Sequence, residues 1–255
     1  MGSRLGRISG VIPKCLLPVG DIPMLCRWVD FCLEQNYEVI FINVFHLSAY
    51  VKREINEKVS QNKGRILIIE ENQLSGTLGF LRKCGRSKWM AQNDISTLDV
   101  VLFAHVDVMW SFDSGIESRV IATNDDPLGL GCLVVSPVKN YEGKGMVQFD
   151  DSSKFILNFE EKPSAWRYPM WANGGILFMS AGLFSYICDE DGTDFFKDAF
   201  PNYYERCCVH IVTKDSLFDI GTLSGYRDAL DTYGHASTFK WRKIQQQVFE
   251  QGDPV

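Results

Sequence analysis

Apolar and polar residues follow each other along the first half of the chain in the patterns of helices that alternate with buried strands. From residue 24 to residue 33 the apolar residues recur at helical spacing, which predicts a helix with one face buried against a sheet. Asp21 and Pro23 precede this stretch and are typical of an N-cap and a first helical turn. Residues 37–44 (YEVIFINV) form a nearly continuous apolar run rich in β-branched residues, which predicts a strand covered on both faces.

The same alternation continues as far as residue 104. The pattern predicts helices near 47–60 and 77–91, and strands at 65–70 and 98–104. Right-handed crossovers between such strands build an open sheet, whose ligands bind at the carboxyl ends of the strands. The sequence therefore predicts an α/β fold, with three layers in a Rossmann-like arrangement and a mainly parallel, mixed central sheet.

The second half of the chain carries further strands and a predicted hairpin. A helix near 112–123 leads to a buried strand at 130–138, and residues 145–159 alternate around a turn in the manner of a β-hairpin. A strand at 172–178 follows the hairpin. The remaining predicted elements are helices at 180–188 and 193–204, a strand at 209–213, and helices at 222–233 and 236–250.

The composition is that of a globular protein with one sizeable core. The 255 residues are 45% hydrophobic and 23% charged. A net charge of -6 argues against nucleic-acid binding, which needs a basic face. The sequence shows no signal peptide and no apolar run long enough to span a bilayer, so we expect a cytoplasmic protein without a membrane partner. Its 8 cysteines lack paired C-x-x-C spacing and are interpreted as reduced core residues.

Two parts of the chain carry residues suited to phosphate and metal. Gly2, Ser3, Arg4 and Lys14 combine accessible backbone N–H groups with two cations. This combination suits a polyphosphate, although a short Gly/Ser/Arg segment at a chain start is more often a flexible end. Asp107 follows the predicted strand at 98–104. A carboxylate in that position is a hard oxygen ligand of the kind that Mg²⁺ prefers.

Three other features allow two interpretations each. Residues 74–79 (LSGTLG) place glycines around a threonine at a helix start, which fits a ligand lying against the backbone or a plain helix turn. His105 fits a base or a ligand, and more often a structural or polar lining role. The aromatic residues and methionine between 166 and 171 fit the wall of a sugar pocket, and more often a satellite hydrophobic cluster.

These segments resemble, in order, the motifs of the sugar-1-phosphate nucleotidyltransferase family. Residues 2–19 resemble the second part of its GGxGTRLxPLTxxxPKPLLPV signature without a gap, and residues 74–79 resemble its LGTxG segment. FEEKP at 159–163 is the most specific short match. ANGGILF at 172–178 resembles the family's NxGIYxF strand, and LFDIGT at 217–222 resembles its WxDIGT motif.

The resemblance implies the nucleotide-diphospho-sugar transferase type of fold and a reaction of an NTP with a sugar 1-phosphate to give an NDP-sugar and pyrophosphate. It implies that Arg4 and Lys14 grip the triphosphate, that Asp107 and Asp219 hold Mg²⁺, and that Lys162 holds the phosphate of the sugar phosphate. The nucleotidyltransferase domain would span 1–235, with a C-terminal helix and tail at 236–255. The substrate-binding residues implied are Gly2, Ser3, Gly76, Thr77, Gly145, Glu161, Asn173 and Gly174.

Several departures from the family keep two alternatives open. Cys15 replaces a proline, Val106 replaces the glycine before the metal-binding aspartate, and the Pro-Leu of PLT is missing. The last two changes, together with the missing start of the signature, favour a catalytically inactive relative that binds nucleotide or a partner subunit. A metal-dependent glycosyltransferase is the second alternative, although residues 105–107 lack its DxD pair. The sequence does not determine which nucleotide base and which sugar are used, or whether the protein forms a homo-oligomer.

The resemblance also predicts that the true start of the chain lies upstream. Family members carry an apolar strand and a Gly pair before GTRL, and Met1 stands at the place of an internal methionine. The absent strand would be a central one, so its loss would expose two strand edges. We therefore expect the 255-residue chain to be poorly soluble, weak in NTP binding, or dependent on a partner strand.

Overall fold

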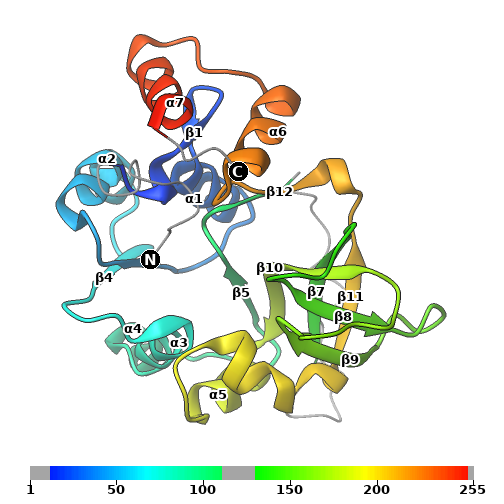
Figure 1. Ribbon diagram of the computed structural model, residues 1–255. Helices are drawn as coiled ribbons and strands as arrows, with labels where there is room; N and C mark the ends of the chain where they lie inside the picture. The colour runs from blue at the N-terminus through cyan, green and yellow to red at the C-terminus, as the bar shows by residue number, and fades with distance from the viewer. Residues whose placement is uncertain (1–11, 111–129, 252–255) are drawn as a thin grey trace. The chain divides into compact units, whose positions relative to one another are not determined.

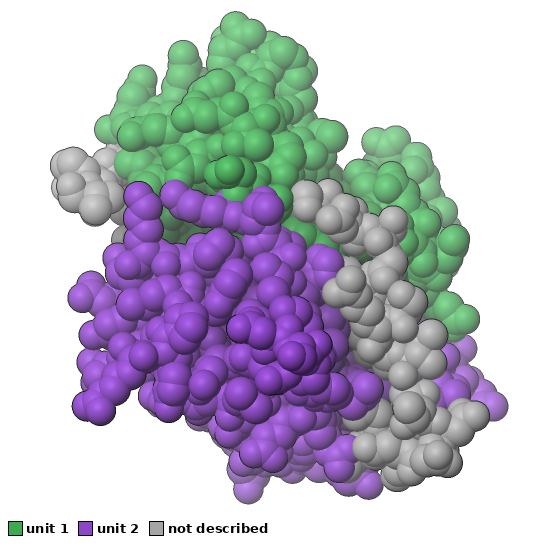
Figure 2. Space-filling model, turned by 90° about the vertical axis from the view of Figure 1, so that its right-hand side faces the viewer, with its two compact units in different colours: residues 1–74, 106–112, 215–255 green, residues 75–105, 113–214 purple. Residues whose placement is uncertain are grey.

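A computed structural model describes residues 12–110 and 130–251 (Figure 1). The chain divides into two compact units, each assembled from segments far apart in the sequence (Figure 2). Unit 1 comprises residues 1–74, 106–112 and 215–255, and unit 2 comprises residues 75–105 and 113–214. The helix predicted near 112–123 lies outside the described residues, and the predicted division at residue 235 stays a prediction.

Helix α1 of unit 1 begins directly after a proline, and the predicted N-cap role of Asp21 is wrong. A short pair of strands, β1 (Pro18–Val19) and β2 (Ile22–Pro23), leads into α1 (Met24–Glu34), whose N-cap is Pro23. The Asp21 carboxylate instead accepts hydrogen bonds from the backbone N–H groups of Ser237 and Thr238, both at 2.9 Å. These residues precede α7 (Phe239–Gln251). Asp21 therefore satisfies donors before a helix that is distant in sequence.

The predicted strand–helix–strand unit is confirmed. Strands β3 (Ile40–Val44) and β4 (Ile66–Glu70) pair in parallel and are joined by α2 (Ser48–Gln61). Among the described residues β3 pairs with β4 alone, and its Asn43 is exposed. The prediction that this strand is covered on both faces is therefore wrong. Its buried face packs in a cluster that includes Leu16, Leu25, Val29, Ile42, Val44, Val51 and Ile55.

A second strand pair and two helices complete unit 1. Strand β6 (Val108–Trp110) pairs antiparallel with β12 (Leu217–Asp219), and α6 (Leu223–Tyr233) follows β12. Trp110 is fully buried and stacks on Trp28, with ring centroids 6.5 Å apart. The indole Nε1 of Trp28 donates to the carbonyl oxygen of Val108 at 3.1 Å. Helix α1 thus packs against β6 through an aromatic stack and a buried hydrogen bond.

Unit 2 is built around a mixed sheet of six strands. The order is β11-β7-β10-β8-β9, with β5 also paired to β10. Strands β7 and β11 are parallel, whereas β10 is antiparallel to β5, β7 and β8. The hairpin predicted at 145–159 is confirmed as β8–β9. The strands are β5 (Val100–Ala104), β7 (Gly131–Pro137), β8 (Gly145–Phe149), β9 (Ile156–Glu161), β10 (Trp171–Ser180) and β11 (Cys207–Ile211).

The helices of unit 2 are more broken than the sequence predicts. The single helix predicted at 77–91 is two helices, α3 (Gly76–Gly85) and α4 (Lys88–Gln92). They are separated because the Ser87 side chain caps α4 by accepting from the N–H of Met90. Helix α5 (Ala181–Asp189) begins as predicted, with Ser180 as its N-cap.

The helix predicted at 193–204 is also irregular. It consists of a π-helical turn (Phe195–Ala199) and two 3₁₀ turns (Phe200–Asn202 and Tyr204–Arg206). Phe195, Phe196 and Phe200 pack there against one another, with ring centroids 4.8 to 5.8 Å apart. The packing of these rings overrides the regular helical spacing.

Other expectations have simple outcomes. Trp166 is buried in a small cluster with Met146 and Ala172, against which Met170 packs, so the hydrophobic-cluster interpretation holds for these two residues. All 8 cysteines are free thiols. In the two described stretches of chain, no helix has both the length and the apolar character needed to cross a membrane.

The Asp21 contact predicts an acid-dependent change in stability. Hydrogen bonds from the Ser237 hydroxyl and the Thr238 backbone lower the pKa of Asp21 from 3.8 to about 2. Because the folded-state pKa is depressed, the stabilisation is complete above pH 3.8 and is lost as the pH falls towards 2. We expect Asp21→Asn to lower the urea midpoint at pH 7 and to differ less from the unsubstituted protein at pH 3. Asp151→Asn, a matched charge change in the β8–β9 turn, should show no such convergence.

Candidate active site

The pairing of β6 with β12 brings Asp107 and Asp219 together. Asp107 directly precedes β6, Asp219 ends β12, and Asp219 is the register partner of Val108. The N–H of Ile220 donates to the carbonyl oxygen of Asp107 at 2.9 Å. Two segments far apart in the sequence thus place their carboxylates at the same end of a short ladder.

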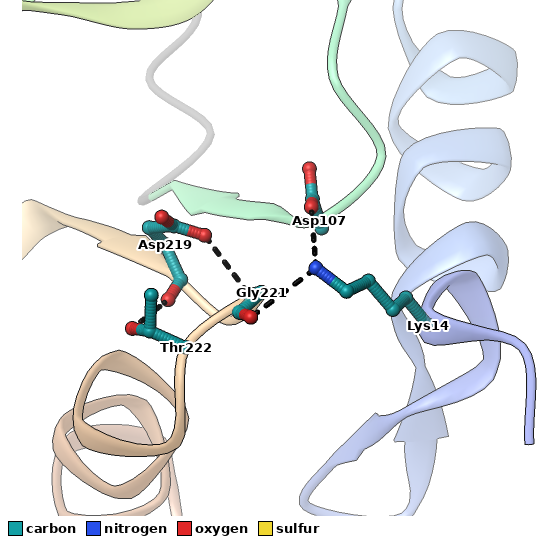
Figure 3. Close-up of polar contacts among 5 residues, drawn as sticks. All are labelled: Lys14, Asp107, Asp219, Gly221 and Thr222. Atoms are coloured by element: carbon teal, nitrogen blue, oxygen red, sulfur yellow. Dashed lines mark hydrogen bonds and ion pairs between the residues drawn. The ribbon is translucent and has the colours of Figure 1, made fainter. Parts of the chain in front are cut away.

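Gly221 leaves a small open space between these carboxylates. A Cβ atom at Gly221 would stand 2.8 Å from each of three atoms: Asp107 Oδ2, Asp219 Oδ1 and Lys14 Nζ. Any two of these atoms therefore lie within twice that distance of each other (Figure 3). Only glycine fits here without displacing a charged group.

Lys14 belongs to the same group of side chains. Its Nζ donates to the carbonyl oxygen of Gly221 at 3.2 Å and forms an ion pair with Asp107 Oδ2 at 3.6 Å (Figure 3). The side chains of Lys14 and Asp107 are 23% and 31% exposed, so water screens this pair only in part. Lys14 lies in a 3₁₀ turn (Lys14–Leu16) that the fully buried Leu16 anchors.

The loop from Asp219 to Thr222 is held by its own hydrogen bonds. Asp219 Oδ1 accepts from the N–H of Gly221 at 2.9 Å. The Thr222 hydroxyl donates to the carbonyl oxygen of Asp219 at 3.0 Å and, as the N-cap of α6, accepts from the N–H of Gly225 at 3.1 Å. The Asp219 carboxylate is therefore oriented before any ligand binds.

This group of atoms fits a small divalent cation whose remaining ligands come from elsewhere. Carboxylate and carbonyl oxygens are the ligands that Mg²⁺ prefers, and Asp107, Asp219 and Gly221 supply them around the open space. No cluster of three or more acidic, histidine or cysteine side chains suitable for a metal occurs among residues 12–110 and 130–251. The protein's own ligands are thus too few to complete a shell, and phosphate oxygens are the natural complement.

A second group of predicted residues lies on three neighbouring strands of unit 2. Gly145 of β8 is the register partner of Glu161 at the end of β9. A Cβ atom at Gly145 would stand 2.5 Å from Glu161 Oε2 and 3.3 Å from the Cβ of Asn173 in β10. The Lys162 Nζ lies 3.2 Å from Glu161 Oε1, and the Lys162 side chain is 56% exposed. Four predicted residues are therefore brought together.

Next to Asn173, the structure shows Gly175, which the sequence analysis did not place in the site, and His105, for which it left a base, ligand or structural role open. Asn173 Oδ1 accepts from the N–H of Gly175 at 2.8 Å, where the β7–β10 register shifts. Gly175 has a φ of +72°, and its missing Cβ would stand 3.2 Å from His105 Nδ1. The ring of His105 packs edge-on against Phe103, at 5.3 Å between centroids. The signal was the second glycine of the Gly-Gly pair, because a glycine inside a strand often marks a bulge.

The predicted nucleotide residues Gly76 and Thr77 make internal contacts. The Thr77 hydroxyl accepts from the N–H of Phe195 at 2.8 Å. A Cβ atom at Gly76 would stand 2.2 Å from the carbonyl oxygen of Thr193. These contacts explain both residue types without a ligand, so a role in nucleotide binding stays a prediction. Gly174 is buried within β10.

The remaining predicted site residues, Gly2, Ser3 and Arg4, lie outside the described residues. Their contact with a triphosphate also stays a prediction.

Comparison with known proteins adds a family and a fold. The family model described as nucleotidyl transferase matches residues 1–235. The chain is similar to the D-glycero-alpha-D-manno-heptose 1-phosphate guanylyltransferase of Campylobacter jejuni, with 21% identity over 89% of this chain and 93% of that protein. It is also similar to the bifunctional protein GlmU of Methanococcus aeolicus, with 28% identity over 64% of this chain and 34% of that protein.

A solved structure extends the likeness to most of the chain. A putative glucose-1-phosphate thymidylyltransferase from Bacillus anthracis matches with a TM-score of 0.70, covering 95% of each chain at 19% identity. The predicted α/β fold of the nucleotide-diphospho-sugar transferase type is thereby confirmed.

The same substitution is predicted to have different effects at two glycines of the β12–α6 segment. A Cβ at Gly225 would stand 2.1 Å from the backbone carbonyl oxygen of Asp219, so Gly225→Ala should destabilise the fold by about 1–3 kcal/mol. A Cβ at Gly221 meets the ends of side chains, which can turn away. Gly221→Ala should therefore change the melting temperature less and weaken Mn²⁺ binding. Thermal unfolding and Mn²⁺ titration measure the two effects, and equal melting temperatures for the two variants would contradict this account.

Proposed function

We propose that this chain, which belongs to the nucleotidyl transferase family, transfers a nucleotidyl group from an NTP to a sugar 1-phosphate and releases pyrophosphate. The observation that carries the proposal is the convergence of Lys14, Asp107 and Asp219 around the open space at Gly221. Its similarity to a heptose 1-phosphate guanylyltransferase and to a putative glucose-1-phosphate thymidylyltransferase supports the proposal. The proposal does not specify the nucleotide base of the NTP or the sugar. A cytoplasmic location stays a prediction.

The reaction asks the protein mainly for positioning and charge neutralisation. A phosphate oxygen of the sugar phosphate attacks the α-phosphorus of the NTP in line, and pyrophosphate leaves from the opposite side. Asp107 and Asp219 would hold Mg²⁺, which when bound neutralises charge on the triphosphate. Lys14, together with Arg4, would bind the triphosphate and the departing pyrophosphate as a charge-assisted hydrogen-bond donor.

The group on unit 2 supplies the contacts expected for the acceptor. Lys162 is more than half exposed beside Glu161, so its ammonium can exchange that partner for the phosphate of a sugar 1-phosphate. Asn173 uses its Oδ1 to accept from Gly175, and its amide NH₂ can then donate to a sugar hydroxyl. Glu161 lies over Gly145, and a carboxylate there can accept from further hydroxyls.

Loss of either predicted metal carboxylate should abolish turnover. We expect Asp107→Asn and Asp219→Asn each to lower kcat/KM by at least about a hundredfold, because each removes charge that faces the developing transition state. Pyrophosphate release, measured with a panel of NTPs and sugar 1-phosphates, gives the rate, and far-UV circular dichroism checks the fold. Full activity of either variant, or of the unsubstituted protein in excess chelator, would contradict the metal assignment. No turnover with any pair would favour the inactive, nucleotide-binding alternative.

Substitution of Lys162 should impair the use of the sugar 1-phosphate without changing the binding of the NTP. Lys162→Met keeps the length of the side chain and removes its charge, so kcat/KM for the sugar 1-phosphate should fall on the order of a hundredfold. The dissociation constant of the NTP, from calorimetry, should stay unchanged. Lys139→Met is the matched control, because Lys139 is an exposed lysine two residues after the end of β7. Unchanged sugar 1-phosphate kinetics in Lys162→Met would show that FEEKP is not the acceptor site.

A further inference from the structure

Lys14 borders the space that a cation bound by the two carboxylates would need. Its Nζ, Asp107 Oδ2 and Asp219 Oδ1 each stand 2.8 Å from the same point, the position of an absent Cβ at Gly221. The Nζ also donates to the carbonyl oxygen of Gly221 at 3.2 Å. Asp107 and the carbonyl of Gly221, two of the three oxygen-bearing groups that fit a divalent cation, thus contact the ammonium group (Figure 3).

An ammonium group and a divalent cation cannot share this space without cost. Both are attracted by the same oxygens, and they repel each other strongly at such distances when water is partly excluded. The side chains of Lys14 and Asp107 are less than a third exposed, so mobile ions screen the repulsion poorly. While Lys14 keeps its place, it weakens the binding of a divalent cation.

Lys14 can leave this space without disturbing the fold. Its backbone is held by a 3₁₀ turn whose Leu16 is fully buried, and four methylene groups separate that backbone from the ammonium group. The carboxylate of Asp219 keeps its orientation without Lys14, because it accepts from the N–H of Gly221. What Lys14 needs is another anion, and a triphosphate offers one together with additional oxygen ligands for the cation.

We infer that Lys14 is the built-in cation of this carboxylate site and that it makes divalent-metal binding depend on the nucleotide. Without a nucleotide, Lys14 neutralises Asp107 and lowers the affinity of the site for metal. When a nucleoside triphosphate binds, Lys14 moves to the phosphates and the metal enters with them. The nucleotide step rests on the proposed function, whereas the competition between Lys14 and the metal does not.

The inference is tested by measuring Mn²⁺ binding to the full chain by electron paramagnetic resonance. Without nucleotide, Lys14→Met should bind Mn²⁺ more tightly than the unsubstituted protein, on the order of tenfold, because the competing charge is gone. Lys52→Met is the matched control, because Lys52 forms an ion pair with Glu70 at 2.5 Å elsewhere in unit 1. It should leave Mn²⁺ binding unchanged. In Lys14→Met/Asp107→Asn the gain should disappear.

The nucleotide arm uses a non-hydrolysable NTP analogue. The analogue should tighten Mn²⁺ binding to the unsubstituted protein by a larger factor than in Lys14→Met. Lys14→Gln, which keeps a polar side chain, replaces Lys14→Met if circular dichroism shows that the methionine variant is not folded. If the folded Lys14 variant binds Mn²⁺ no more tightly than the unsubstituted protein in the absence of nucleotide, the inference is overturned. Absence of pyrophosphate release in the unsubstituted protein would overturn the proposed function instead, and the nucleotide-free Mn²⁺ measurements would still be decisive.

Discussion

The antiparallel pairing of β6 with β12 is the contact on which the candidate active site depends. It is only three residues long on each strand, so its own hydrogen bonds would not hold it in water. Burial supplies the rest: Met109 and Trp110 are almost completely buried, and the indole of Trp28 donates to the carbonyl oxygen of Val108. The aromatic packing of α1 against β6 thus fixes where Asp107 stands relative to Asp219.

Two carboxylates held this close repel each other, and the structure compensates with an ammonium group. Lys14 lies between Asp107 and the carbonyl of Gly221, and the absence of a side chain at Gly221 leaves room for it. The second group of site residues, on unit 2, also contains a lysine paired with a carboxylate, because Lys162 forms an ion pair with the adjacent Glu161. In each group a lysine neutralises a carboxylate in the free protein and can turn to a phosphate. Such a lysine suits the proposed transfer between two phosphorylated substrates.

The glycines of the predicted motifs serve different purposes. Gly145 and Gly221 keep space open beside charged side chains, and a Cβ at either would meet a carboxylate oxygen. Gly76 is required by the protein itself, because the carbonyl of Thr193 occupies the space of its missing side chain. A motif glycine therefore indicates close approach of some atom, and the tertiary structure decides whether that atom belongs to a ligand or to the protein.

The sequence by itself determined the alternation of helices and strands, the β8–β9 hairpin and the grouping of candidate residues by motif. These features follow from local periodicity and from turn chemistry, which short stretches of chain encode. Predictions from the sequence failed where contacts between distant segments outweigh local patterns. Asp21 accepts hydrogen bonds from donors before α7, and the packing of three phenylalanines accompanies a π-helical turn at residues 195–199. The exposure of Asn43 in β3, the bulge at Gly175 and the place of Lys14 between Asp107 and Gly221 were also decided by tertiary structure. Each depends on atoms brought together from separate segments, and no pattern within one segment specifies such a contact.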